Sequence, residues 1–255
     1  MRHIKKAVNE STVELDRQNI IGIPKSDTEA TLRWKRFSEK RLISKYLLDR
    51  QFGLCCYTEL NLTDFAHEQN SGYHIEHEKP KSLFPQLTFD FGNLLLCALN
   101  SQDLEHILAH LQFGGHFKKS KYDAQLFISP HQYNCREFFV YSSSTGEITP
   151  NLSRSTAEQQ KAQYTIDLLN LNAPFLKAER LQWLQEIEDC LEPFIDSGDK
   201  ASIELIAETE LLPYEREHPQ LMHSCSQLRK FHSAVRSIFG AVGEMVIRTH
   251  CPTLD

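Results

Sequence analysis

The segments HIEHEKPKS (residues 74–82) and NLLLCALN (residues 93–100) decide the fold expected for this chain. The first predicts a strand that ends near Pro80, because proline has no N–H to donate to a ladder. The second is an apolar run of strand length. It is followed by SQDLEHILAHLQ (residues 101–112), which has helical periodicity and a possible cap at Ser101. Together they predict a ββα unit.

This unit carries side chains suited to hydrolysis of a phosphodiester. Histidine titrates near neutral pH, so His77 is a candidate general base that would take a proton from water. Mg²⁺ prefers oxygen ligands, and Glu76 and Asn100 offer a carboxylate and an amide oxygen. Neighbours in a strand point to opposite faces, so Glu76 and His77 can meet one phosphate only where the strand ends or bulges.

Other polar side chains of the unit have supporting roles in this interpretation. Asn93, at the start of the second strand, is expected to tie the loop back to the first strand through its carboxamide. For His116, which follows Gly114 and Gly115, a place near the site and a structural hydrogen bond are both open.

Basic residues suggest a path for a phosphate backbone. Apolar and basic residues alternate at helical spacing from about Glu29 to Gln51, which predicts one amphipathic basic helix. Its polar face either follows a nucleic acid or is simply solvated. The candidate nucleic-acid-binding residues are Lys79, Lys81, Lys118, Lys121, Arg36 and Arg41.

Composition limits the class of protein. The 255 residues carry a formal charge of −6, but residues 1–125 hold 17 Lys+Arg against 16 Asp+Glu, so the acidity lies in the second half. Seven scattered cysteines favour reduced thiols over a disulfide framework. No apolar run reaches the roughly 20 residues that span a bilayer, and no secretory signal is evident. We therefore expect a cytoplasmic protein that does not act in a membrane.

The rest of the chain divides into three predicted parts. Residues 1–45 would form an arm and the basic helix, residues 46–145 the core, and residues 146–255 a helical region. Within residues 1–30 we expect an arm or loop. EFFVYSSSTGEI, near the end of the core, predicts a second strand pair, and beyond Pro150 the pattern is helical throughout.

These segments, together with HFKKSK, YSSSTGEITP and TIDLLNLN, resemble the HNH, or ββα-metal, endonucleases. The similarity is closer to the PtuB family of Septu-type antiphage defence, which also occurs beside retrons. It implies His77 as the general base, Glu76 and Asn100 as metal ligands, and Asn93 as the central asparagine. His74 also matches a catalytic-motif position of the family. The resemblance further implies Mg²⁺ or Mn²⁺, an ABC/SMC-type ATPase partner of the PtuA kind, and in retrons a reverse transcriptase with its RNA–DNA product.

The chain departs from this family at its zinc knuckle. Relatives often carry two Cys-x-x-Cys pairs. Here Thr58 stands where the second cysteine of the first pair would be, three residues after Cys55, and Leu96 and Leu99 stand at the positions of the second pair. A structural zinc is therefore not expected, and Cys56 and Cys97 are expected to pack together as apolar side chains.

The sequence thus predicts an α+β protein with a ββα-metal (HNH) nuclease core, an N-terminal helix and a helical C-terminal region. The predicted function is metal-dependent endonucleolytic cleavage of DNA or RNA as the effector of an antiphage complex. The alternative is a catalytically decayed subunit of the same ATPase-containing complex, kept for assembly or for binding nucleic acid.

Overall fold

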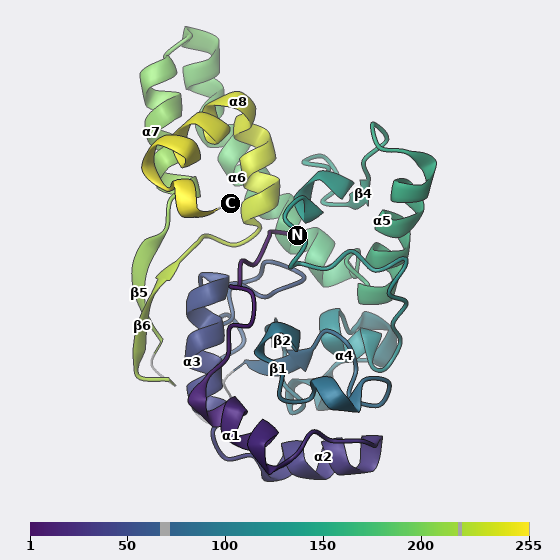
Figure 1. Cartoon of the computed structure of the whole chain (residues 1–255). Helices are drawn as coiled ribbons and strands as arrows, with labels where there is room; N and C mark the ends of the chain where they lie inside the picture. Colours follow the sequence, from purple (N-terminus) through teal and green to yellow (C-terminus); the bar gives the residue numbers. More distant parts are fainter. Residues whose placement is uncertain (67–71, 219–220, 255) are drawn as a thin grey trace.

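The computed structural model describes residues 1–66, 72–218 and 221–254 and shows an α+β protein (Figure 1). Its α-helices are α1 (Val13–Ile21), α2 (Asp27–Arg36), α3 (Lys40–Gln51), α4 (Gly114–Lys118), α5 (Thr156–Leu169), α6 (Pro174–Ser197), α7 (Lys200–Leu211) and α8 (His232–His250). Its strands are β1 (Tyr73–His77), β2 (Leu94–Ala98), β3 (Phe139–Tyr141), β4 (Ile148–Pro150), β5 (Tyr214–His218) and β6 (His223–Gln227). They form three separate antiparallel pairs, β1–β2, β3–β4 and β5–β6.

The central pair is β1 and β2, the two strands that the sequence predicts. Their register sets His74 opposite Cys97 and His77 opposite Leu94. Every residue of β2 is buried, as expected for an apolar run, and β1 ends at His77, shortly before Pro80. The strand prediction is confirmed here because burial and a proline stop act locally.

The helix predicted for residues 101–112 is wrong. The chain forms two short 3₁₀ turns there, Asp103–His106 and Ala109–Leu111. The Asn100 side-chain oxygen accepts the N–H groups of Gln102 (2.7 Å) and Asp103 (3.2 Å), and such bonds compete with a regular helix. The α-helix that follows the strand pair is α4, which begins at Gly114, where the sequence suggested a break.

The N-terminal region also differs from the prediction. The expected arm contains α1, which Thr12 caps by accepting the Leu15 N–H. The single basic helix is two helices, α2 and α3, because the backbone of Phe37 is extended and its ring is buried against Trp34 and Phe89.

The second half is largely helical, as predicted, and the β3–β4 pair confirms the predicted strand pair. The hairpin of β5 and β6 was not predicted, because its strands are polar and half exposed. It extends away from α7 and α8 and runs beside α3, so it joins the C-terminal helices to the N-terminal part (Figure 1). The division at residues 45 and 145 stays a prediction.

A buried ion pair fastens the start of the chain to the last long helix. The Met1 α-ammonium lies 3.0 Å from Glu59 Oε1 and is fully buried. It also donates a hydrogen bond to the Tyr141 hydroxyl, and Glu59 Oε2 accepts the Ser233 N–H at 2.6 Å. Within the described residues, no helix has a long enough apolar stretch to cross a membrane.

Candidate active site

A cavity of about 320 Å³ runs along the edge of β1. In the part of the chain that the structure describes, β1 pairs only with β2. His77 is the last residue of β1, so Glu76 and His77 both line the cavity where the strand ends, as expected for neighbours that would otherwise point to opposite faces. The lining residues are Asp27 and Thr31 of α2, His74, Ile75, Glu76 and His77 of β1, and Pro80, Lys81, Ser82, Gly115, His116, Lys119 and Ser120.

His77 is held as a neutral imidazole with one nitrogen free to accept a proton. Its Nε2 lies 3.0 Å from the Thr88 carbonyl, which can only accept, so Nε2 carries the hydrogen and donates. Nδ1 therefore has the lone pair, and it receives a long contact of 3.4 Å from Lys81 Nζ. Burial, and then the charge of Lys81, lower the pKa of His77 to about 3. The Trp34 ring packs edge-on against the imidazole, with centroids 4.6 Å apart.

Glu76 is a buried carboxylate that already has a cationic partner. Its Oε1 lies 2.8 Å from Nζ of Lys118, a residue of α4 with no exposed side-chain surface. Burial alone would raise the pKa of Glu76, but the Lys118 ammonium and then His74 lower it to about 2. Glu76 is therefore ionised at neutral pH. Lys118 also donates to the backbone carbonyls of His77 (3.3 Å) and Glu78 (3.0 Å), which ties α4 to the end of β1.

Two further imidazoles surround the other carboxylate oxygen. His74 Nδ1 donates to the Leu99 carbonyl at 2.7 Å, so in the neutral imidazole the lone pair is on Nε2. That nitrogen lies 3.4 Å from Glu76 Oε2. The His116 ring lies against His74 with centroids 4.0 Å apart, and its Nε2 is buried without a hydrogen-bond partner among the described residues. Burial and then His74 lower the pKa of His116 to about 4.

The carbonyl that accepts the His74 hydrogen bond belongs to Leu99, a residue with a strained backbone just after β2. Leu99 has a φ of 68°, in the left-handed region that non-glycine residues seldom adopt. Such strain is retained where the surroundings impose it, often at functional sites. Here the strained backbone of Leu99 directs its carbonyl toward His74.

Asn93 makes the backbone contacts that the sequence suggested. Its side-chain oxygen accepts the Lys79 N–H at 2.8 Å, and its amide nitrogen donates to the carbonyls of Lys79 (3.0 Å) and Leu87 (3.2 Å). The carboxamide thus closes the loop between β1 and β2. It does not line the cavity of β1, and its place is structural support for the segment that follows His77.

The atoms around Glu76 fit a divalent cation. When His74 is protonated, its Nε2 donates to Glu76 Oε2 at 3.4 Å; when His74 is neutral, the same two atoms are adjacent acceptors, an arrangement that a divalent cation stabilises. A metal-binding histidine usually donates its second nitrogen to a carbonyl or carboxylate, as His74 does. Among the described residues, no third His, Cys or carboxylate donor forms a compact set with this pair. Water would fill the remaining positions, as is usual for Mg²⁺.

The structure does not bring Asn100 into this group. Its oxygen accepts from Gln102 and Asp103, and it does not line the cavity. His74 lies beside Glu76, where Asn100 was predicted. His74 could be found from the sequence because it begins the motif that also contains Glu76 and His77. The packing of His116 could not, because it depends on α4, a helix that was not predicted.

The predicted nucleic-acid-binding residues separate into four groups. Lys81 lines the cavity, and burial lowers its pKa. Lys118 is a correction: it is fully buried and paired with Glu76, so it is not a surface contact for nucleic acid. Lys79 lines a different cavity. The exposed remainder is Lys121, just beyond the cavity, Arg36 at the end of α2, and Arg41 on α3.

The two-stranded sheet followed by α4, with helical regions on either side, is consistent with an HNH nuclease fold. No family model matches the chain. The chain is 28% identical over 148 residues to a protein of Vibrio cholerae serotype O1 biovar El Tor named "Retron Vc95 putative HNH endonuclease". The match covers 58% of this chain and 66% of that relative, just under two thirds of its length.

Proposed function

We propose that this protein is a metal-dependent HNH endonuclease that hydrolyses phosphodiester bonds in DNA or RNA. The observation that carries the proposal is the shared cavity in which a neutral His77, with the lone pair on Nδ1, lies beside the ionised Glu76 and its neighbour His74. The similarity to a relative named as an HNH endonuclease supports the same reaction class.

In this mechanism the chain supplies the base, the ion ligands and a cation. His77 Nδ1 accepts the proton of the attacking water, while the Thr88 carbonyl holds the ring in the required tautomer. Glu76 and His74 would hold a divalent ion, which when bound supplies Lewis-acid stabilisation of the phosphate charge. Lys81, beside His77 Nδ1, is placed to pair with a phosphate oxygen.

The ligand set bears on the choice of ion. Mg²⁺ takes oxygen ligands almost exclusively, whereas an imidazole is better tolerated by the later first-row metals, with Mn²⁺ between the two. Since His74 adds a nitrogen to the Glu76 carboxylate, we expect faster cleavage with Mn²⁺ than with Mg²⁺ at equal concentration.

The test is cleavage of plasmid DNA and of tRNA by the purified protein, with each ion and with chelator. We expect Glu76→Gln to lower the rate by about 100-fold or more, because the ion loses its charged ligand. Glu78→Gln is the matched control, since Glu78 is also buried but lines another cavity and bonds to Ser129. Chelator-resistant cleavage, or equal rates for Glu76→Gln and wild type, would refute the metal role.

A second prediction uses the close approach of α4 to the carboxylate. A Cβ at Gly115 would lie 2.5 Å from Glu76 Oε2 and 2.9 Å from His74 Nε2. Gly115→Ala should therefore push the two groups apart and lower the rate by about 100-fold, the effect of an ångström-scale displacement. The measurement is the cleavage rate beside circular dichroism of the folded variant. Gly92→Ala, an exposed site with only a 3.1 Å approach to Asp90 Oδ1, should cleave normally.

We further propose that the activity serves an antiphage defence complex. The partners would be an ABC/SMC-type ATPase of the PtuA kind and, in a retron setting, a reverse transcriptase with its RNA–DNA product. The support is the name of the relative, which assigns that protein to a retron, and the lack of a GxxxxGK[ST] segment in this sequence. Copurification with neighbouring gene products tests the assembly.

The catalytically decayed subunit remains the rival function, and one observation favours it. The side-chain oxygen of Asn100, a ligand position implied by the resemblance, accepts the N–H groups of Gln102 and Asp103. If the wild-type protein assembles with its partners but cleaves neither substrate with either ion, the rival is correct and phage protection should survive Glu76→Gln.

A further inference from the structure

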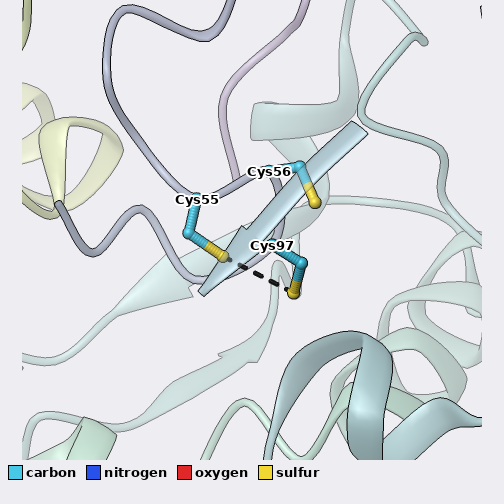
Figure 2. A group of neighbouring side chains, drawn as sticks. All are labelled: Cys55, Cys56 and Cys97. Atoms are coloured by element: carbon cyan, nitrogen blue, oxygen red, sulfur yellow. Dashed lines mark hydrogen bonds between the residues drawn. The ribbon is translucent and has the colours of Figure 1, made fainter. Parts of the chain in front are cut away.

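Three buried cysteine thiols meet beside the candidate active site (Figure 2). Cys55 and Cys56 lie in the loop after α3, and Cys97 lies in β2. Their sulfur atoms are all within 4.8 Å of one another, and Cys55 Sγ lies 3.8 Å from Cys97 Sγ. The exposed fractions are 1%, 2% and 0%. In the described residues this is the one group of three metal-binding side chains with donor atoms this close.

Backbone N–H groups point at two of the sulfurs. Ala98 N–H donates to Cys55 Sγ at 3.2 Å, and Gly115 N–H donates to Cys97 Sγ at 3.3 Å. A neutral thiol is a weak acceptor, whereas a thiolate is a charged one, and hydrogen bonds to charged acceptors are about twice as strong. Three thiols that served only as apolar filling would gain little from these donors.

The backbone holds the sulfurs at fixed positions. Cys55 N–H donates to the Leu60 carbonyl at 2.8 Å, and Cys56 N–H donates to the Leu96 carbonyl of β2 at 3.0 Å. On the other side α4 approaches through Gly114, which has a φ of 63°. A Cβ there would lie 2.7 Å from Cys97 Sγ, so the approach requires glycine. The three donors are therefore positioned by the loop, β2 and α4 together.

We propose that Cys55, Cys56 and Cys97 bind one thiophilic d¹⁰ cation, Zn²⁺ or Cu⁺, as three thiolates. The three thiol protons are released to solvent as the three metal–sulfur bonds form, with no change in oxidation state. Thiolates select Zn²⁺ and Cu⁺ over Mg²⁺ or Mn²⁺, so this site is chemically separate from the Glu76 pair. Cu⁺ accepts three sulfurs, whereas Zn²⁺ would need a fourth donor such as a water molecule.

This proposal differs from the expectation of a zinc-free knuckle filled by packing, which stays a prediction until ion binding is measured. The two Cys-x-x-Cys pairs of the relatives are absent from the sequence. Instead, Cys56 and Cys97, which lie outside those motif positions, lie close to Cys55. The structure confirms that Cys56 and Cys97 lie together and adds Cys55 to them. Cys97 lies opposite His74 in the ladder, and Gly115 touches Glu76, so the bound ion would fix both sides of the catalytic pair.

The experiment titrates the reduced, metal-free full-length protein with Co²⁺, a coloured substitute for Zn²⁺, and follows sulfur-to-cobalt charge-transfer absorption. A band that saturates near one Co²⁺ per chain and is displaced by Zn²⁺ supports the zinc form. A parallel arm titrates Cu⁺ against a coloured Cu⁺ chelator, and tight one-to-one competition supports the copper form. In either case the melting temperature should rise when the ion binds.

Variants locate the ligands. Cys97→Ser should weaken binding by more than about tenfold, because a hydroxyl replaces a thiolate. Cys190→Ser is the matched control, since Cys190 is exposed and distant in sequence, and its binding should equal wild type. The proposal is overturned if the folded wild-type protein, with its thiols shown to be reduced, binds neither Co²⁺ nor Cu⁺ and melts at the same temperature with each ion. It is also overturned if Cys97→Ser binds as tightly as wild type.

Discussion

His77→Ala is expected to lower the cleavage rate by about 100-fold to 10,000-fold, the range for loss of a general base. His77 donates from Nε2 to the Thr88 carbonyl and keeps the Nδ1 lone pair beside Lys81 at 3.4 Å. His116 lines the same cavity and its Nε2 has no partner among the described residues, so His77 is chosen as the base because Lys81, which can pair with a phosphate, lies beside its Nδ1. The measurement is single-turnover cleavage with saturating metal ion.

The control for this result is another buried histidine. His232 is 1% exposed, donates from Nε2 to the Leu211 carbonyl at 3.1 Å, and has its pKa lowered to about 4, largely by burial. His232→Ala should therefore cost stability as His77→Ala does, yet leave the rate intact well below the melting temperature. Equal loss of activity in both variants would show that folding, and not base catalysis, explains the effect at His77.

Glu59→Gln is expected to lower the free energy of unfolding by about 3 to 5 kcal/mol, the range for breaking a buried ion pair from one side. The substitution leaves the Met1 α-ammonium buried without a counter-charge and weakens the contact to Ser233. Urea unfolding at pH 7, followed by circular dichroism, measures the change. Glu188→Gln on α6, at an exposed position, should unfold like wild type.

The pH dependence gives this prediction a second readout. Burial alone would raise the pKa of Glu59, but the Met1 ammonium and the Ser233 hydrogen bonds lower it to about 2, from an ordinary value of 4.5. A carboxyl group whose pKa is lower in the folded state stabilises the fold at pH values above its unfolded-state pKa. This stabilisation is lost as the pH falls toward the folded-state pKa. The difference between wild type and Glu59→Gln should thus be constant from pH 5 to pH 7 and shrink between about pH 4.5 and 2. A difference that does not change with pH would contradict the ion-pair account.

Local sequence signals predicted the strands better than the connections. β1 and β2 were predictable because a proline stop and an apolar run act within a few residues. The 3₁₀ turns after β2 were not, since the pattern of residues 101–112 is helical and the competing bonds of the Asn100 side chain are visible only in three dimensions. The polar β5–β6 hairpin lacks the alternation on which strand prediction depends.

The site shows the same limit. The adjacency of Glu76 and His77 in the sequence was enough to locate the cavity, and Asn93 was predictable as a loop tie. The burial of Lys118 was not predictable, because it results from the docking of a helix that begins only at Gly114. For the same reason the meeting of Cys55 with Cys97 could not be anticipated from their spacing.

The ion pair between Lys118 and Glu76 has a consequence for the metal-free protein. An acid that already has an ammonium at 2.8 Å keeps its shape and its charge when no divalent ion is present. The Glu76 carboxylate is therefore already ionised and held in place by Lys118, and the binding of a divalent ion beside it would need no refolding of this part of the chain.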